Sequence, residues 1–194
     1  MSDIICVTNR SLCKEDFLTR IRRIAECAPK AIILREKDLP ESEYCRLAEK
    51  VMGICNDLRV DCILHSFYRS AAALGCKAVH LPLPVLRLSP DLSAFSVIGS
   101  SCHSPLDAAE AVRLGATYVT AGHVFQTDCK KGLPPRGLGF LSEVCRSVDV
   151  PVFAIGGISP ENISSVINAG AAGGCIMSGL MNCDPDALYH IFGK

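Results

Sequence analysis

The chain has 194 residues, of which 49% are hydrophobic, so it is long enough for one sizeable hydrophobic core and short for two. Its twenty lysines and arginines balance twenty aspartates and glutamates, which leaves no basic field to attract nucleic acid or an anionic membrane surface. We therefore expect a single domain over residues 1–194, whose partner is a small neutral or anionic metabolite.

Neither a targeting segment nor a membrane span is predicted. The opening residues, MSDIICVTNR, lack a basic stretch followed by an apolar core, and no apolar run approaches the roughly 18 to 20 residues that a membrane span needs. The expected location is the cytoplasm.

The twelve cysteines are scattered along the chain and form no CxxC pair, which favours buried, reduced thiols. Cys102 and Cys129 lie beside polar segments. For these two, a nucleophile or a soft-metal ligand is the alternative to a small residue that fills space.

Eight short apolar runs predict β-strands. They lie at residues 3–8, 30–36, 61–65, 78–82, 96–102, 118–125, 150–157 and 173–179. Almost none of them alternates polar with apolar residues, which is typical of strands buried on both faces of a parallel sheet.

Helical periodicity occupies much of the sequence between these runs. The clearest helix candidates are residues 14–28, 42–55, 104–114 and 159–170. The last two begin with Ser-Pro, a helix start, and the final one ends on Gly170, a helix stop. Residues 82–95 are rich in proline, and we expect them to replace a regular fourth helix. Eight β–α repeats predict a (β/α)8 barrel, with an open doubly wound sheet as the alternative.

In such a barrel the functional residues are expected where each strand ends and the sequence turns polar. These positions hold Arg35, Glu36, Lys37, His65, Ser66, His80, Ser100, Ser101, His123, Thr127, Lys130, Gly156, Gly157, Ser178 and Gly179. A single rim that gathers so many titratable groups and glycines is predicted to be the active site.

The glycines after the seventh and eighth predicted strands indicate a phosphate site. Gly156-Gly157 and Ser178-Gly179 supply permissive backbone there, and glycine lets main-chain N–H groups approach an anion. The alternative for Gly156-Gly157 is a tight turn. Thr127, Lys130 and Lys131 are candidates to bind a second anionic group, with a solvated surface loop as the alternative.

Of the five histidines, His123 is the strongest candidate for chemistry. Gly122 leaves room for a ligand, and a polar, basic loop follows. An imidazole is able to take or give a proton near neutral pH, whereas the alternative is a structural histidine. His80 is divided between core packing and function, His103 between a helix start and function, and His190 is expected at the surface.

Five segments resemble the thiamine phosphate synthase superfamily, in the same order and over nearly the whole chain. They are ILREKD (33–38), IGSSCHS (98–104), GHVFQTDCKKG (122–132), FAIGGISPENI (153–163) and GAAGGCIMSG (170–179). This superfamily holds a magnesium-dependent synthase, which couples a pyrimidine diphosphate to a thiazole phosphate. It also holds a TenI-like thiazole tautomerase, which aromatises the thiazole phosphate without metal.

Two departures from the synthase pattern favour the tautomerase. The synthase has Asn-Asp-Arg where this chain has His65-Ser66-Phe67, and an acidic ligand where this chain has Val85. Magnesium prefers oxygen ligands, and a departing diphosphate needs its charge compensated. Gly122-His123 also resembles the tautomerase rather than the Gly-Pro usual in the synthase. The resemblance therefore predicts an isomerase, the thiazole tautomerase of thiamin biosynthesis.

The resemblance also implies roles for individual residues. His123 is the implied acid and base of the proton shift, and Ser101 the implied hydrogen-bond partner of the substrate carboxylate or of the developing charge. The implied contacts to phosphate and to the rest of the substrate are Arg35, Lys37, Thr127, Lys130, Gly156, Gly157, Ser178 and Gly179. Lys37, Thr127 and Lys130 match positions that bind diphosphate in the synthase.

The same resemblance implies no metal, no cofactor, a thiazole phosphate as the small-molecule partner, and a homo-oligomer. Two alternatives stay open beside the tautomerase. One is a divergent, magnesium-dependent thiamine phosphate synthase, and the other is a non-catalytic or regulatory homologue that binds a thiazole phosphate.

Overall fold

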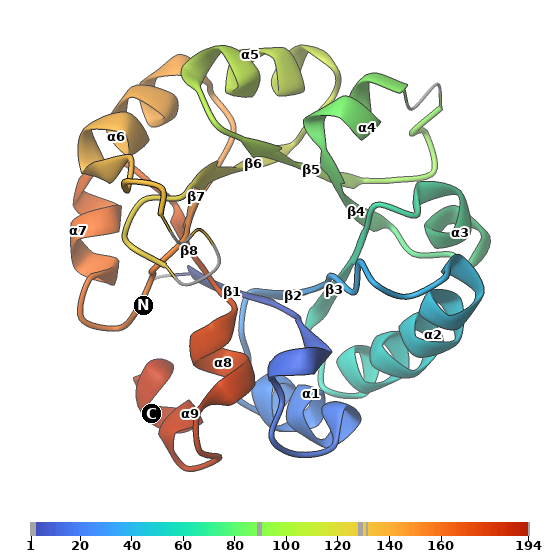
Figure 1. The fold of residues 1–194 in the computed structure, drawn as a ribbon. Coiled ribbons are helices and arrows are strands. Elements are labelled where there is room, and N and C mark those ends of the chain that lie inside the picture. The colour runs from blue at the N-terminus through green and yellow to red at the C-terminus, as the bar shows by residue number, and fades with distance from the viewer. Residues whose placement is uncertain (1–2, 89–90, 128–129, 131, 194) are drawn as a thin grey trace.

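The computed structural model describes residues 3–88, 91–127, 130 and 132–193. Eight parallel strands form a closed barrel in sequence order, and β8 pairs with β1 (Figure 1). The strands are β1 (Asp3–Val7), β2 (Ala31–Leu34), β3 (Asp61–His65), β4 (Ala78–Pro82), β5 (Val97–Cys102), β6 (Tyr118–Gly122), β7 (Val152–Ile155) and β8 (Gly173–Ile176). The predicted (β/α)8 barrel is confirmed, and the open sheet is excluded.

Helices surround the barrel on its outside (Figure 1). They are a 3-10 turn η1 (Arg10–Leu12), α1 (Phe17–Glu26), α2 (Glu41–Asp57), α3 (Tyr68–Ala73), α4 (Leu83–Leu88), α5 (Pro105–Arg113), α6 (Gly137–Ser147), α7 (Ile163–Asn168), α8 (Ser178–Asn182) and α9 (Ala187–Ile191). None of these helices in the described chain is long and apolar enough to cross a membrane.

The proline-rich segment 82–95 departs from the prediction. Its first part forms the short helix α4 directly after β4, so a fourth helix is present. Pro84 is the second residue of that helix, where a backbone N–H has no intrahelical partner to lose. Proline therefore marks the start of this helix rather than its absence.

Of the two helix starts predicted at Ser-Pro, the one at Ser104 is confirmed, and the one at Ser159 lies before the observed start of the helix. Ser104 caps α5, since its side chain accepts a hydrogen bond from the backbone N–H of Asp107 at 3.0 Å. The segment that begins at Ser159 makes a turn first, in which the Asn162 side chain accepts from Ser159 N–H, and α7 begins at Ile163.

Two apolar clusters explain why the strand sequences are apolar throughout. One fills the barrel interior with alternate strand residues, among them Ile5, Ile33, Ile63, Tyr118 and Phe153. The other lies between the strands and the helices. Because successive side chains of a strand point to opposite faces, every second residue faces the barrel axis. The inward series that continues to the carboxyl end of each strand supplies the side chains of the site.

No disulfide joins the eleven cysteines among the described residues, and six of them are buried. Cys129 and Lys131 lie outside the described residues, so the predictions made for them stay predictions.

Candidate functional site

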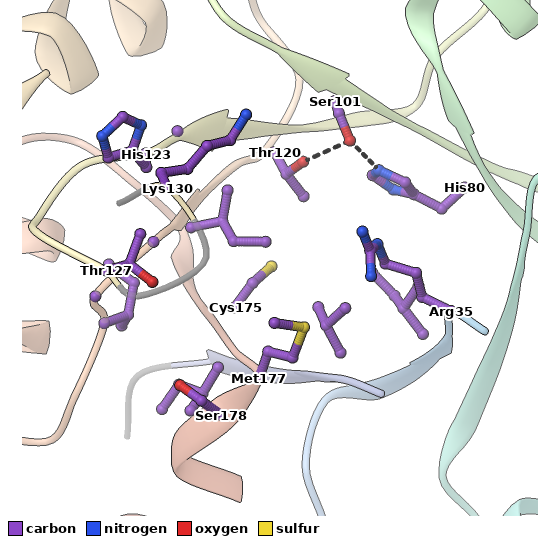
Figure 2. A pocket seen from close by; sticks show the side chains of 18 of the residues that line it. Arg35, His80, Ser101, Thr120, His123, Thr127, Lys130, Cys175, Met177 and Ser178 are labelled. Atoms are coloured by element: carbon purple, nitrogen blue, oxygen red, sulfur yellow. Dashed lines mark hydrogen bonds between the residues drawn. The ribbon is translucent and has the colours of Figure 1, made fainter. Parts of the chain in front are cut away.

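A cavity of about 320 Å³ opens at the carboxyl ends of the strands. Of the ten residues to which the resemblance gives a role, its lining includes all except the exposed Gly179: Arg35, Lys37, Ser101, His123, Thr127, Lys130, Gly156, Gly157 and Ser178. Three further residues of the predicted rim, Glu36, Ser66 and Ser100, do not line it. Figure 2 shows His123, Thr127 and Lys130 on one side of this cavity and Arg35 with His80 on the other. The barrel therefore gathers residues that are up to 143 positions apart in the sequence, from Arg35 to Ser178.

Three cationic side chains line the cavity among the residues that the structure describes. Arg35 and Lys37 follow β2, and Lys130 reaches in from the loop after β6. The pKa of Lys37 is lowered by burial and by the positive charges of Arg35 and Lys130. No aspartate or glutamate is found among the described lining residues. Such a group favours an anionic ligand, because each cation lowers its electrostatic energy when a negative charge binds between them.

The carboxylate of Glu36 is close in sequence but does not enter this cavity. It is buried, and it accepts a 2.6 Å hydrogen bond from the Thr8 hydroxyl and hydrogen bonds of 3.0 and 3.1 Å from the Arg10 backbone N–H. Side chains after β2 therefore alternate in direction: Arg35 and Lys37 line the cavity, and Glu36 between them points away from it.

The glycines after β7 have a structural reason to be glycine. Gly156 and Gly157 have φ values of +96° and +67°. A Cβ on Gly156 would lie 2.4 Å from the Cβ of His123, and one on Gly157 would lie 2.4 Å from the Gln126 carbonyl oxygen. Both glycines therefore allow the loop after β6 to pack directly on the end of β7. Their predicted contact with phosphate stays a prediction beside this packing role.

His123 follows β6 and is 9% exposed. Its Nε2 lies 3.4 Å from the Leu133 carbonyl oxygen, a long and weak hydrogen bond, while its own carbonyl accepts a hydrogen bond from Arg136 N–H at 3.0 Å. The backbone is thus held firmly, and the imidazole is free to exchange its weak contact for a ligand.

On the opposite wall, His80 belongs to a hydrogen-bonded group that crosses three strands. Its Nε2 lies 2.8 Å from Ser101 Oγ, and its Nδ1 lies 2.9 Å from the Tyr118 hydroxyl. Thr120 donates a longer bond of 3.4 Å to Ser101 Oγ (Figure 2). Burial, with a smaller contribution from Arg35, lowers the pKa of His80 to about 3, so the ring is neutral at physiological pH.

Sequence reasoning missed Tyr118 and Thr120. The signal that would have found them is the two-residue alternation of β6, which sends both inward beside Ser101 of β5.

His65 lies beside His80 at the end of β3. The two rings stack with centroids 5.8 Å apart, and His65 Nδ1 lies 2.7 Å from the Ser66 hydroxyl. Burial first, and then the neighbouring His80, Arg35 and Lys37, lower the pKa of His65 to about 2.

By resemblance, this wall is where the synthase binds magnesium through carboxylates. Among the described residues, no three or more histidines, cysteines, aspartates or glutamates are grouped so as to hold a metal ion. Two neutral imidazoles and a serine do not provide the charged oxygen ligands that magnesium prefers. The residues of this chain therefore do not fit a magnesium ion at that position.

Cys102 and His103 both line the cavity. Burial, and then Asp107, raise the pKa of the Cys102 thiol to about 12, which disfavours a thiolate nucleophile. His103 takes part in the start of α5, where its backbone N–H donates to Asp107, and its Nδ1 lies 3.0 Å from the Gly122 carbonyl oxygen.

Comparison with known proteins gives the family. The family model for thiamine monophosphate synthase matches residues 4–180. The thiamine-phosphate synthase of Roseiflexus castenholzii is 35% identical over 162 residues, which are 81% of this chain and 71% of that protein. The putative thiamine-phosphate synthase 2 of Aquifex aeolicus is 31% identical over 176 residues, 88% of this chain and 92% of that protein.

The structural comparison agrees. The thiamine phosphate pyrophosphorylase from Pyrococcus furiosus is similar with a TM-score of 0.82 and 26% identity, over 97% of this chain and 93% of that one.

These findings contradict the predicted isomerase. The two sequence relatives are named as a thiamine-phosphate synthase and a putative one, and the structural relative as a thiamine phosphate pyrophosphorylase; these names describe transferases. The prediction gave most weight to Gly122-His123 and to the missing acidic residues after β3 and β4. Those substitutions change the lining of the cavity, but they do not outweigh a likeness to synthases over most of the chain. By that likeness, the chain belongs to the thiamine monophosphate synthase family of thiamin biosynthesis.

Proposed function

We propose that the chain is a transferase that joins a thiazole phosphate to a pyrimidine diphosphate. In this reaction the thiazole nitrogen forms a bond to the carbon that carries the diphosphate. The bond from that carbon to oxygen breaks, and its electron pair leaves with the diphosphate. The observation that carries the proposal is the carboxylate-free cavity among the described residues, with three cations around its opening. Such a cavity suits substrates that bring several negative charges.

The three cations are assigned to the diphosphate. Arg35, Lys37 and Lys130 all line the cavity, and the positive charges of Arg35 and Lys130 help to lower the pKa of Lys37, which supports an anion shared by the three. Positive groups aimed at a departing diphosphate stabilise the charge that it gains in the transition state. Thr127, from the same loop as Lys130, is a further contact.

The phosphate of the thiazole is assigned to Gly156, Gly157 and Ser178, which follow β7 and β8 and supply backbone and hydroxyl groups to the lining. Ser101 of β5 and His123, which directly follows the neighbouring strand β6, are assigned to the heterocycles that carry the two anionic groups. No step of this proposal passes through magnesium, because His65, Ser66 and Val85 do not offer its ligands.

A second candidate is a homologue that binds a thiazole phosphate without transferring it. The neutral wall of His65 and His80 favours it, since these two rings bring no charge to compensate a diphosphate.

Both candidates are tested by one set of measurements. The purified protein is given a thiazole phosphate and a pyrimidine diphosphate, with magnesium or with excess EDTA, and thiamine phosphate formation is followed by chromatography. Binding of each substrate alone is measured by calorimetry. Arg35→Met is compared with Lys50→Met, which removes an exposed cation of α2 that does not line the cavity.

We expect turnover that falls by about 100-fold or more in Arg35→Met, as for removal of a donor to developing charge, and is unchanged in Lys50→Met. Binding of the thiazole phosphate without turnover in either condition supports the second candidate. If the protein neither binds a substrate nor turns it over, both candidates are refuted.

A further inference from the structure

We propose that Tyr118 and His80 are positioning residues that fix Ser101 as a hydrogen-bond donor to the bound substrate. The identity of that substrate rests on the proposed function, but the hydrogen-bond direction does not. The inference depends on two contacts that join three side chains, Tyr118 to His80 and His80 to Ser101, together with the glycine that makes room for them.

The chain of contacts is buried at one end and open at the other. Tyr118 is 5% exposed and His80 is 3% exposed, whereas Ser101 lines the cavity. The Tyr118 hydroxyl lies 2.9 Å from His80 Nδ1, and His80 Nε2 lies 2.8 Å from Ser101 Oγ. Both distances are those of ordinary hydrogen bonds, so each contact has one donor and one acceptor.

A neutral imidazole carries one N–H, which leaves two possible directions for the whole chain. Burial lowers the pKa of His80 and raises that of Tyr118, so both groups stay uncharged at physiological pH. In one direction, Tyr118 donates to Nδ1 and Nε2–H donates to Ser101. In the other, Ser101 donates to Nε2 and Nδ1–H donates to Tyr118.

The second direction leaves a buried donor without a partner. If Tyr118 accepts from Nδ1–H, its own O–H needs another acceptor, and the described residues offer the hydroxyl no hydrogen-bond partner besides His80. A buried hydroxyl that loses its bond is costly. In the first direction every buried donor is paired, and the one hydroxyl left over belongs to Ser101, at the cavity. The first direction is therefore favoured.

Thr120 strengthens this assignment. Its hydroxyl donates to Ser101 Oγ at 3.4 Å, from the next strand. A serine oxygen accepts two hydrogen bonds and donates one. With His80 and Thr120 as its donors, Ser101 has its own O–H left for the cavity, where it meets a ligand atom that accepts. The same direction excludes His80 as a base that would make Ser101 a nucleophile.

Gly99 explains how the contact with Tyr118 is possible. It pairs with His80 on one side and with Tyr118 on the other, in the register of β4, β5 and β6. A Cβ on Gly99 would lie 2.1 Å from Tyr118 Cζ and 2.4 Å from its hydroxyl oxygen. The tyrosine ring therefore occupies the space above this glycine and crosses β5 to reach the imidazole.

The first test needs no ligand. Nitrogen-15 NMR of the imidazole rings distinguishes a protonated nitrogen from an unprotonated one, and His80→Gln identifies the His80 signals by their loss. We expect wild-type His80 to carry its proton on Nε2, with Nδ1 unprotonated. A proton on Nδ1 would overturn the proposal.

Tyr118→Phe tests the role of the tyrosine. Removal of its hydroxyl takes away the donor to Nδ1, so His80 is expected to populate both tautomers. Tyr44→Phe is the matched control, because it also removes a buried hydroxyl, one bonded to the Leu34 carbonyl and to the His65 N–H. A His80 spectrum that is unchanged in Tyr118→Phe, or changed equally in Tyr44→Phe, contradicts the assignment.

Ligand binding tests the donor. Ser101→Ala is expected to weaken binding of the thiazole phosphate or of the pyrimidine diphosphate about five- to tenfold, as for loss of one hydrogen bond. Tyr118→Phe is expected to weaken the same ligand and to add nothing in the Ser101→Ala background, because its effect passes through Ser101. Additive losses, or none, refute this step. If wild type binds neither ligand, the proposed function fails, while the tautomer still decides the hydrogen-bond direction.

Discussion

Acid should destabilise this protein through the two imidazoles on the wall of the cavity. His65 and His80 are buried and neutral, with pKa values lowered to about 2 and about 3. In the unfolded chain a histidine has a pKa of about 6.5. Below that pH the unfolded state binds protons that the folded state does not, so stability falls as the pH falls. Above pH 6.5 both states are neutral, and the effect is absent.

The size of the effect follows from the linkage. Between pH 7 and pH 5, an unfolded imidazole goes from mostly neutral to mostly charged, while the folded His80 stays neutral. Each pH unit over which the unfolded imidazole is charged and the folded one is neutral lowers the free energy of unfolding by about 1.4 kcal/mol. Over this range the free energy of unfolding falls by about 2 kcal/mol for each histidine. Water that enters the cavity stabilises a charged imidazole in the folded state, so this loss of stability is an upper value.

The assay is urea unfolding of wild type and His80→Gln at pH 7 and pH 5. Glutamine keeps a polar side chain of similar length but has no proton to gain in this range. The loss of stability between the two pH values is expected to be about 2 kcal/mol smaller in His80→Gln than in wild type. Carboxylates that titrate in both proteins cancel in this comparison. An equal loss in both proteins would refute the reasoning, since it would mean that His80 is protonated in the folded state as readily as in the unfolded one.

Three further outcomes are expected. Gly156→Ala places a Cβ against His123 at a φ of +96°, so it should lower the melting temperature and weaken thiazole phosphate binding together; calorimetry that finds both unchanged contradicts the packing argument. Arg20 is 1% exposed, and its Nη2 donates to the Cys183 carbonyl at 2.8 Å, so Arg20→Leu should cost about 2 kcal/mol in urea unfolding, and a loss near zero speaks against this bond. Lys130→Met should weaken diphosphate binding and reduce its salt dependence in a titration at two ionic strengths; an unaltered salt dependence removes Lys130 from the anion site.

Some elements of the fold were easier to predict from the sequence pattern than others. The eight strands were predictable because a strand buried on both faces must be apolar throughout. Their ends were less so, since Val124 and Phe125 extend the apolar run of β6 without joining the sheet. They pair instead with the backbone of Ile155 and Gly156, at the end of β7. A buried loop and a buried strand give the same composition.

The sequence also led to one wrong conclusion about function. His123 and the missing acidic residues after β3 and β4 are real features of the cavity, but they describe single positions. The family model matches residues 4–180, so it compares almost the whole chain, and it identifies a synthase family. A substitution at one site residue changes one group of the cavity. The reaction depends on all the groups that a substrate contacts.

By itself, the sequence determined the barrel, the rim that holds the site and most of the residues on that rim. Strand burial and the places where apolar runs turn polar are local properties of the chain, so a pattern reveals them. Only the tertiary structure decided what those residues do to one another. Glu36 turns away from the cations beside it, Gly156 is needed by His123, and Tyr118 reaches His80 across Gly99. Each of these depends on side chains from different strands meeting in three dimensions, and no spacing along one strand records such a meeting.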